Sequence, residues 1–100
     1  MDYRGILPGI LTELGYNSGS IDAVVSGVYN QENKQLGSQE GSQRTARVSV
    51  PIGKEGDILI FLLERVGNTV RTLEVVLAGP NRERLYRRMP EYAQQIIKHG

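Results

Sequence analysis

The chain has 100 residues, of which 39% are hydrophobic and 23% are charged, and its formal net charge is +1. At this length we expect one domain, spanning residues 1–100, with a single hydrophobic core. A net charge so close to zero gives no whole-molecule argument for binding to nucleic acid or a membrane. The sequence has no cysteine, which excludes disulfides, thiolate metal sites and cysteine nucleophiles.

The sequence carries no sign of export or membrane insertion. Its first residues form neither a basic leader nor a long apolar run, and no stretch reaches the roughly 18 apolar residues of a membrane span. The absence of cysteine fits a reducing compartment. We therefore expect a cytoplasmic protein, with a processed secreted or anchored domain as the alternative.

A short amphipathic helix is predicted near the N-terminus. Apolar residues recur there at spacings of three and four, from Ile6 to Leu14. Pro8 is compatible with the first turn of such a helix. Gly15 followed by Tyr16 predicts a left-handed C-cap with its usual hydrophobic contact.

The segment from Ile21 to Tyr29 fits two periods. Alternating apolar residues, including Ala23 and Val25, are typical of a strand, whereas apolar spacings of three and four with Ser20 as N-cap fit a helix about as well. The β-branched content and Gly27 favour the strand.

A flexible loop is predicted for residues 30–44. This run is rich in Gln, Ser, Gly and Glu, and Leu36 is its only apolar side chain. Such a run cannot bury enough apolar surface to order itself well.

Residues 45–52 alternate cleanly and predict a half-buried strand, with four apolar residues on one face: Ala46, Val48, Val50 and Ile52. A five-residue loop over residues 53–57 then places Ile52 opposite Ile58. A four-residue loop would turn these side chains to the other face of the sheet. We favour the five-residue loop.

The pair Gly67-Asn68 lies between two β-branched and aromatic runs and predicts a β-hairpin with a two-residue turn. The strands are residues 58–66 and 69–77. In this register Val66 faces Thr69, and Glu64 faces Arg71, where opposite charges contribute a few tenths of a kcal/mol.

The predicted register gives the hairpin two different faces. One is a core face made of Ile58, Ile60, Leu62, Leu73, Val75 and Leu77. The second is too apolar for open solvent and too polar for a sealed core. Its apolar residues form a candidate interface: Leu59, Phe61, Leu63 and Val76. The alternative is that the N-terminal helix covers them, and the sequence favours neither.

A second helix is predicted after Pro80, with Asn81 as its cap. Its apolar residues, from Leu85 to Ile97, fall within one arc of roughly 140°. Pro90 inside this pattern predicts a kink, or a break and restart, with Met89 pushed toward extended geometry.

Together these elements predict an α+β fold: an antiparallel β-meander of three to four strands, flanked by an N-terminal and a C-terminal helix that cover one face of the sheet.

The sequence offers no catalytic constellation, and we expect a protein that is not an enzyme and has no cofactor or metal. His99 is the only histidine and is next to last, where a frayed tail is the expected context. No His, Asp or Glu cluster has metal-ligand spacing, and no serine motif resembles a nucleophile elbow. The lysine between Gly53 and Gly56 lacks the spacing of a phosphate-binding loop and is interpreted as part of a hairpin loop.

The strongest charge feature is a group of four arginines on the polar side of the C-terminal helix: Arg82, Arg84, Arg87 and Arg88. Such a cluster is suited to phosphates or an acidic partner. Glu83 and Glu91 dilute it, which favours an ordinary solvated face. Arg84 and Arg88 are nevertheless a like-charge pair at i, i+4, which is mildly unfavourable without an anion.

The leading hypothesis is a non-catalytic protein-binding or assembly module that associates with itself, as a homodimer, through its sheet. The alternative is nucleic-acid or phosphate binding through the basic face of the C-terminal helix.

Overall fold

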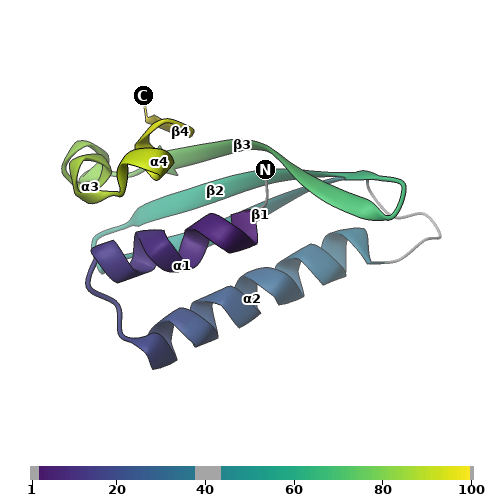
Figure 1. Ribbon diagram of the computed structural model, residues 1–100, viewed down its shortest axis with the longest axis horizontal. Coiled ribbons are helices and arrows are strands. Elements are labelled where there is room, and N and C mark those ends of the chain that lie inside the picture. Colours follow the sequence, from purple (N-terminus) through teal and green to yellow (C-terminus); the bar gives the residue numbers. More distant parts are fainter. Residues whose placement is uncertain (1–2, 38–43, 100) are drawn as a thin grey trace.

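The computed structural model describes residues 3–37 and 44–99, which form an α+β fold with helices before and after the first three strands of a four-stranded sheet (Figure 1). Along the chain the elements are α1 (Tyr3–Glu13), α2 (Ser18–Leu36), β1 (Thr45–Ile52), β2 (Asp57–Val66), β3 (Thr69–Ala78), α3 (Arg82–Arg88), α4 (Glu91–Gln94) and β4 (Ile97–His99). No helix within this part of the chain is both long and apolar enough to cross a membrane.

The sheet is mixed, with the strand order β1-β2-β3-β4. The first three strands form the predicted antiparallel meander, but β4 runs parallel to β3. Parallel neighbours need a crossover connection, and α3 and α4 supply it. The prediction of a purely antiparallel sheet is therefore only partly right, because residues expected to end a helix form a strand instead.

The N-terminal helix is confirmed and its end has the predicted cap, but it begins at Tyr3, so Pro8 lies inside it and not in its first turn as predicted. Gly15 has a φ of +91°, and its N–H donates to the carbonyl of Thr12 at 3.0 Å, while the N–H of Tyr16 donates to the carbonyl of Leu11 at 3.0 Å. These two bonds are those of a Schellman motif. Leu7, Ile10 and Leu11 are fully buried against the sheet.

Residues 21–29 are helical, so the prediction of a strand is wrong. They belong to α2, whose N-cap is Asn17, three residues before the expected Ser20; the Asn17 side chain accepts a bond from the Ser20 N–H at 2.8 Å. The buried stripe of α2 runs through Val28, Glu32 and Leu36 at four-residue spacing. Because Glu32 occupies a buried position of that stripe, the apolar period is hidden in the sequence.

Most of the predicted loop at 30–44 is also helical, because α2 continues to Leu36. Residues 38–43 lie outside the described part of the chain. The packing partner that orders residues 30–36 is the sheet, because α2 runs along the free edge of β1 (Figure 1).

Two glutamines on α2 bind the free backbone edge of β1. The side chain of Gln31 donates to the carbonyl of Ser49 at 3.1 Å and accepts from its N–H at 3.2 Å. Gln35 makes the same two bonds with Arg47, at 3.0 Å each. Gln31 and Gln35 are four residues apart on the helix, a rise of about 6 Å, and their partners are two residues apart on the strand, a rise of about 6.6 Å. The spacing of the two side chains therefore matches that of the two backbone sites. The helix thereby caps an edge that would otherwise be open to another strand.

The turn between β1 and β2 has four residues, and the prediction of a five-residue loop is wrong. Gly53 and Gly56 have φ values of +72° and +94°, and Ile52 pairs with Asp57. This shift of one residue turns Val48 toward the same side as Phe61, its partner across the strands.

The central hairpin is confirmed, with the predicted pairs Val66–Thr69 and Glu64–Arg71. Gly67 has a φ of +61°, as a type II′ turn requires at its first central position. The register changes further along, because Leu63 pairs with Thr72 whereas Leu62 pairs with Glu74. Leu73 is therefore the extra residue of a β-bulge, and the predicted pairs beyond it are wrong.

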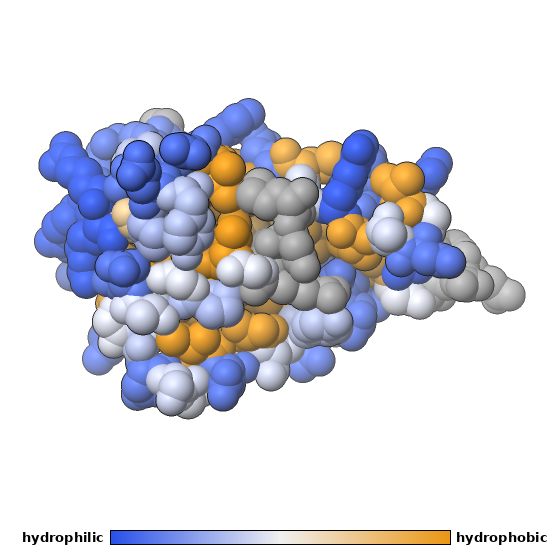
Figure 2. All heavy atoms as spheres, in the orientation of Figure 1, coloured by the Kyte–Doolittle hydropathy of each residue, from blue (hydrophilic) through white to orange (hydrophobic). Residues whose placement is uncertain are grey.

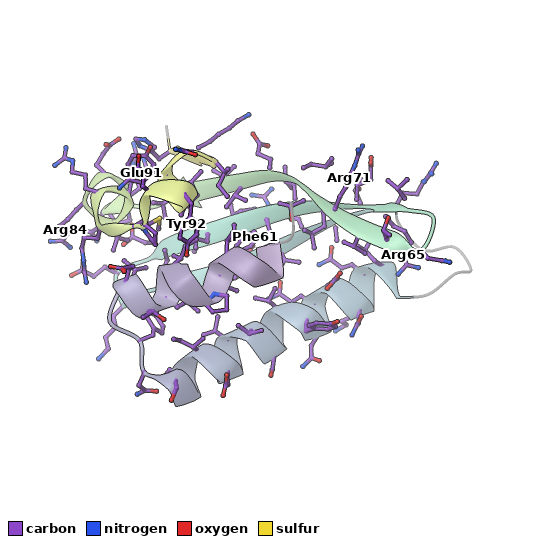
Figure 3. The ribbon with its side chains drawn as sticks, in the orientation of Figure 1. Phe61, Arg65, Arg71, Arg84, Glu91 and Tyr92 are labelled. Atoms are coloured by element: carbon purple, nitrogen blue, oxygen red, sulfur yellow. The ribbon has the colours of Figure 1, made fainter. Side chains whose placement is uncertain are left out.

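The short turn and the bulge together reverse the predicted core. The two shifts bring apolar side chains of β1 and β3 onto the face of the sheet that carries Leu59, Phe61 and Leu63. These three side chains of β2 are fully buried. Phe61 lies between the sheet and α1 (Figure 3). One row across the sheet shows the result, since its four members are each at most 5% exposed: Val48, Phe61, Val75 and Ile97.

The C-terminal helix breaks at Pro90, one of the two predicted outcomes. Met89 is extended, with φ −78° and ψ 154°, and α4 restarts at Glu91. Asn81 stands at the N-cap position of α3, but its side chain makes no capping bond and instead donates to Asp57 and Glu55. The predicted capping role of Asn81 is therefore wrong.

Candidate functional site

The face of the sheet opposite the helices, here called the outer face, is the first candidate site. Its centre is formed by Ile58, Ile60 and Leu62 of β2, which the sequence assigned to the core. None of them belongs to the packed core that the described residues form. Ile60 is nonetheless only 7% exposed, because Ser49 and Val76 flank it on the neighbouring strands. The outer face thus has an apolar stripe along β2, flanked by side chains of β1 and β3.

Charged side chains stand on both sides of this stripe. Strand pairing places Arg47 on one side of Leu62 and Glu74 on the other. Glu74 is bound by Lys98 of β4, with 2.7 Å between Nζ and Oε1. Arg47 has no ion pair within the part of the chain that the structure describes. At the level of Leu62 the outer face therefore carries Arg47 on one side and the Glu74–Lys98 ion pair on the other.

The surface is hollowed beside Leu62. The hollow has a volume of about 370 Å³ and is lined by residues of β1, β2 and β3, together with Gln35 of α2. Leu73, the residue of the β-bulge, stands at this hollow and is 49% exposed. Hydrophobic residues also come to the surface toward the β2–β3 turn (Figure 2). The bulge thus presents a projecting leucine next to a depression.

The predicted interface residues do not form one surface. Leu59, Phe61 and Leu63 are fully buried under the helices, so the prediction that places them in an interface is wrong for these three. The alternative, cover by the N-terminal helix, is what the structure shows, with α2 contributing as well. Only Val76 lies on the outer face, where it pairs with Ile60.

The four predicted arginines have different surroundings. Arg82 donates to the carbonyl of Gly79 at 2.9 Å, so its guanidinium serves the β3–α3 connection. Arg84 donates to Asn81 at 3.1 Å and lies 3.8 Å from Glu55. Arg84 and Arg88 line a common hollow, and Arg87 is exposed outside it. The structure therefore brings together two of the four.

The single histidine is ordered rather than frayed. His99 belongs to β4, its ring stacks on that of Tyr86 with 3.8 Å between centroids, and its Nδ1 lies 3.1 Å from a carboxylate oxygen of Glu83. The prediction of a frayed tail is wrong, because pairing with β3 holds this end of the chain. Within residues 3–37 and 44–99, no group of three or more acidic or histidine side chains could hold a metal ion.

The chain matches no protein-family model, no curated protein and no solved structure.

Two features of the candidate sites are not predicted from the sequence. The sequence assigns the outer-face residues to the core because it predicts the turn one residue too long and gives no local signal for the bulge. Lys54, which lines the same hollow as Arg84 and Arg88, was assigned to an ordinary hairpin loop. Gly53 and Gly56, the first and last residues of the four-residue turn, are the available signal for its length.

Proposed function

We propose that this protein is a non-catalytic assembly module whose partner is a second copy of the same chain, bound through the outer face. The observation that carries the proposal is the row formed by Arg47, Leu62 and Glu74, in which an apolar centre separates opposite charges. Packing of two outer faces would make a sandwich with the helices outside.

A two-fold axis running along β2 fits this row. Such an axis exchanges the two sides of the stripe, so Arg47 of each copy faces Glu74 of the other. The charged groups therefore complement each other in a homodimer without help from another protein. A two-fold axis perpendicular to the strands would keep each side where it is and bring like charges together.

The same axis uses the bulge. It brings the projecting Leu73 of each copy over the hollow beside Arg47 of the other, since the two lie at the same level on opposite sides of β2. Apolar anchors that fill pockets contribute most of the free energy at interfaces of this kind. The bulge would then contribute to association as well as to the core.

The test is the mass of the protein in solution as a function of concentration, by sedimentation equilibrium. We expect the wild type to approach twice the chain's 11.1 kDa, and Leu62→Lys to remain monomeric because it places an ammonium group at the centre of the stripe. Tyr92→Lys is the matched control, since Tyr92 is 48% exposed on α4, on the helix side. Circular dichroism establishes that each variant is folded.

Charge reversal tests the orientation. Arg47→Glu should weaken the dimer by about tenfold, since two pairs are lost and an exposed pair is worth up to about 1 kcal/mol. Adding Glu74→Arg together with Lys98→Glu to that variant should restore the dimer, because the new charges at positions 47 and 74 again face each other and the ion pair between positions 74 and 98 is kept. A wild type that stays monomeric at high micromolar concentration would refute the proposed dimer. A triple variant that dimerises as weakly as Arg47→Glu would refute the proposed axis.

A further inference from the structure

A second hollow lies at the opposite end of the sheet from the bulge, where the β1–β2 turn meets α3. Its volume is about 230 Å³, and its lining includes Lys54 of the turn and Arg84 and Arg88 of α3. Hydrophilic residues gather at the end of the molecule where α3 lies (Figure 2), and Arg84 is there (Figure 3). Cations from two segments far apart in the sequence thus converge on one depression.

A buried carboxylate fixes the two segments to each other. Asp57, at the start of β2, is only 3% exposed. It accepts a bond from the backbone N–H of Asn81 at 2.8 Å and from the Asn81 side-chain amide at 3.0 Å. Gly79 passes close to Asp57 with a φ of +127°, a conformation suited to glycine. The floor of the hollow is therefore built before any ligand arrives.

The charges around the hollow leave a positive excess. Three cations and two carboxylates line it, a formal sum of +1. Both carboxylates already accept bonds from Asn81, at 2.5 Å for Glu55. Glu55 also lies 3.8 Å from Arg84. Lys54 and Arg88 have no ion pair among the residues that the structure describes.

We infer that this hollow binds the phosphate group of a small ligand, held by Lys54, Arg84 and Arg88. Arginine and lysine beside one another are the usual protein groups for a phosphate. An anion between Arg84 and Arg88 would also remove the repulsion of a like-charge pair at i, i+4.

The arrangement favours a single phosphate group over a nucleic-acid backbone. A nucleic-acid surface needs cations spread along a stripe that follows successive phosphates. Here Arg82 is bonded to Gly79 and Arg87 lies outside the hollow, so the cations converge on one place. Glu83 and Glu91 on the same segment further interrupt any stripe.

The experiment is a titration of the ¹⁵N-labelled full chain with inorganic phosphate, followed through backbone amide shifts. We expect a saturable shift of the amides of residues 53–56 and of α3, with millimolar affinity. Arg88→Gln should weaken binding by about three- to fivefold, as expected for loss of one exposed charge pair. Arg87→Gln is the matched control, on the same helix and also exposed, and should leave the affinity unchanged.

Glu55→Gln should raise the affinity for phosphate, whereas Arg88→Gln lowers it. The glutamine oxygen still accepts the bond from Asn81, but the carboxylate charge is gone, so phosphate should bind about three- to fivefold more tightly. Leu62→Lys, at the proposed dimer face, should not change phosphate binding, so the two proposals fail separately.

Three results would overturn the inference. The first is no saturable shift near the hollow at tens of millimolar phosphate. The second is an equal loss for Arg88→Gln and Arg87→Gln, which would show a diffuse field instead of a site. The third is tight binding of a single-stranded oligonucleotide that depends on Arg82 and Arg87 as much as on Arg88, which would favour nucleic acid.

Discussion

Replacing Gln31 by alanine tests whether α2 stabilises the fold by capping the β1 edge. The substitution removes two partly buried bonds, with 3.1 and 3.2 Å between the glutamine side chain and the backbone of Ser49. Each such bond contributes about 0.5–1.5 kcal/mol. Alanine recovers a few tenths of a kcal/mol through its higher helix propensity. We expect the free energy of unfolding to fall by about 1–2 kcal/mol.

Gln35→Ala should have a smaller effect, of about 1 kcal/mol or less. Its two bonds to Arg47 are of similar length but exposed, so water can replace them. Asn30→Ala is the matched control, because Asn30 is an exposed polar residue of the same helix. Alanine there should leave stability unchanged or raise it slightly.

The assay is urea unfolding followed by circular dichroism at a fixed protein concentration, because association also shifts the apparent stability. If Gln31→Ala unfolds at the same urea concentration as Asn30→Ala, the glutamines do not stabilise the fold as argued. The double variant of Gln31 and Gln35 supplies a second readout. It should aggregate faster on warming, measured by light scattering, because the backbone edge of β1 is then open to other strands.

Two glycine substitutions should move stability in opposite directions. Gly27→Ala should raise the free energy of unfolding by about 1 kcal/mol, because it lies inside α2 and an added Cβ meets no atom within 4 Å. Gly27 and Pro51 both line a hollow between α2 and β1, and a lower urea midpoint for this variant would show that this hollow must stay open. Gly79→Ala should lower the free energy of unfolding by more than about 2 kcal/mol, since φ is +127° and the new Cβ would collide with Asp57. An unchanged midpoint there would contradict the tight packing of this connection.

Local signals were sufficient wherever a few neighbouring residues fix the backbone. Gly67 determines the hairpin turn, Gly15 ends α1, and Pro90 breaks the C-terminal helix, each through its own allowed φ values or its missing N–H. The strand at residues 45–52 was likewise visible from its alternation alone.

The candidate site could be predicted only in pieces. The arginines of α3 were recognised as a charge cluster, but the approach of Lys54 depends on the Asp57–Asn81 contact, between residues 24 positions apart. The outer face was recognised as a set of alternating residues and assigned to the wrong side.

Taken alone, the sequence determined that this protein has helices at both ends of a meander and that one face of its hairpin is a core. Only the tertiary structure decided which face. Strand side chains alternate with a period of two, so one residue fewer in the β1–β2 turn and one more at Leu73 each reverse which side the neighbouring strand presents to β2. The helices then cover Phe61 and leave Leu62 outside, because only that side lets all three strands bury their apolar residues together.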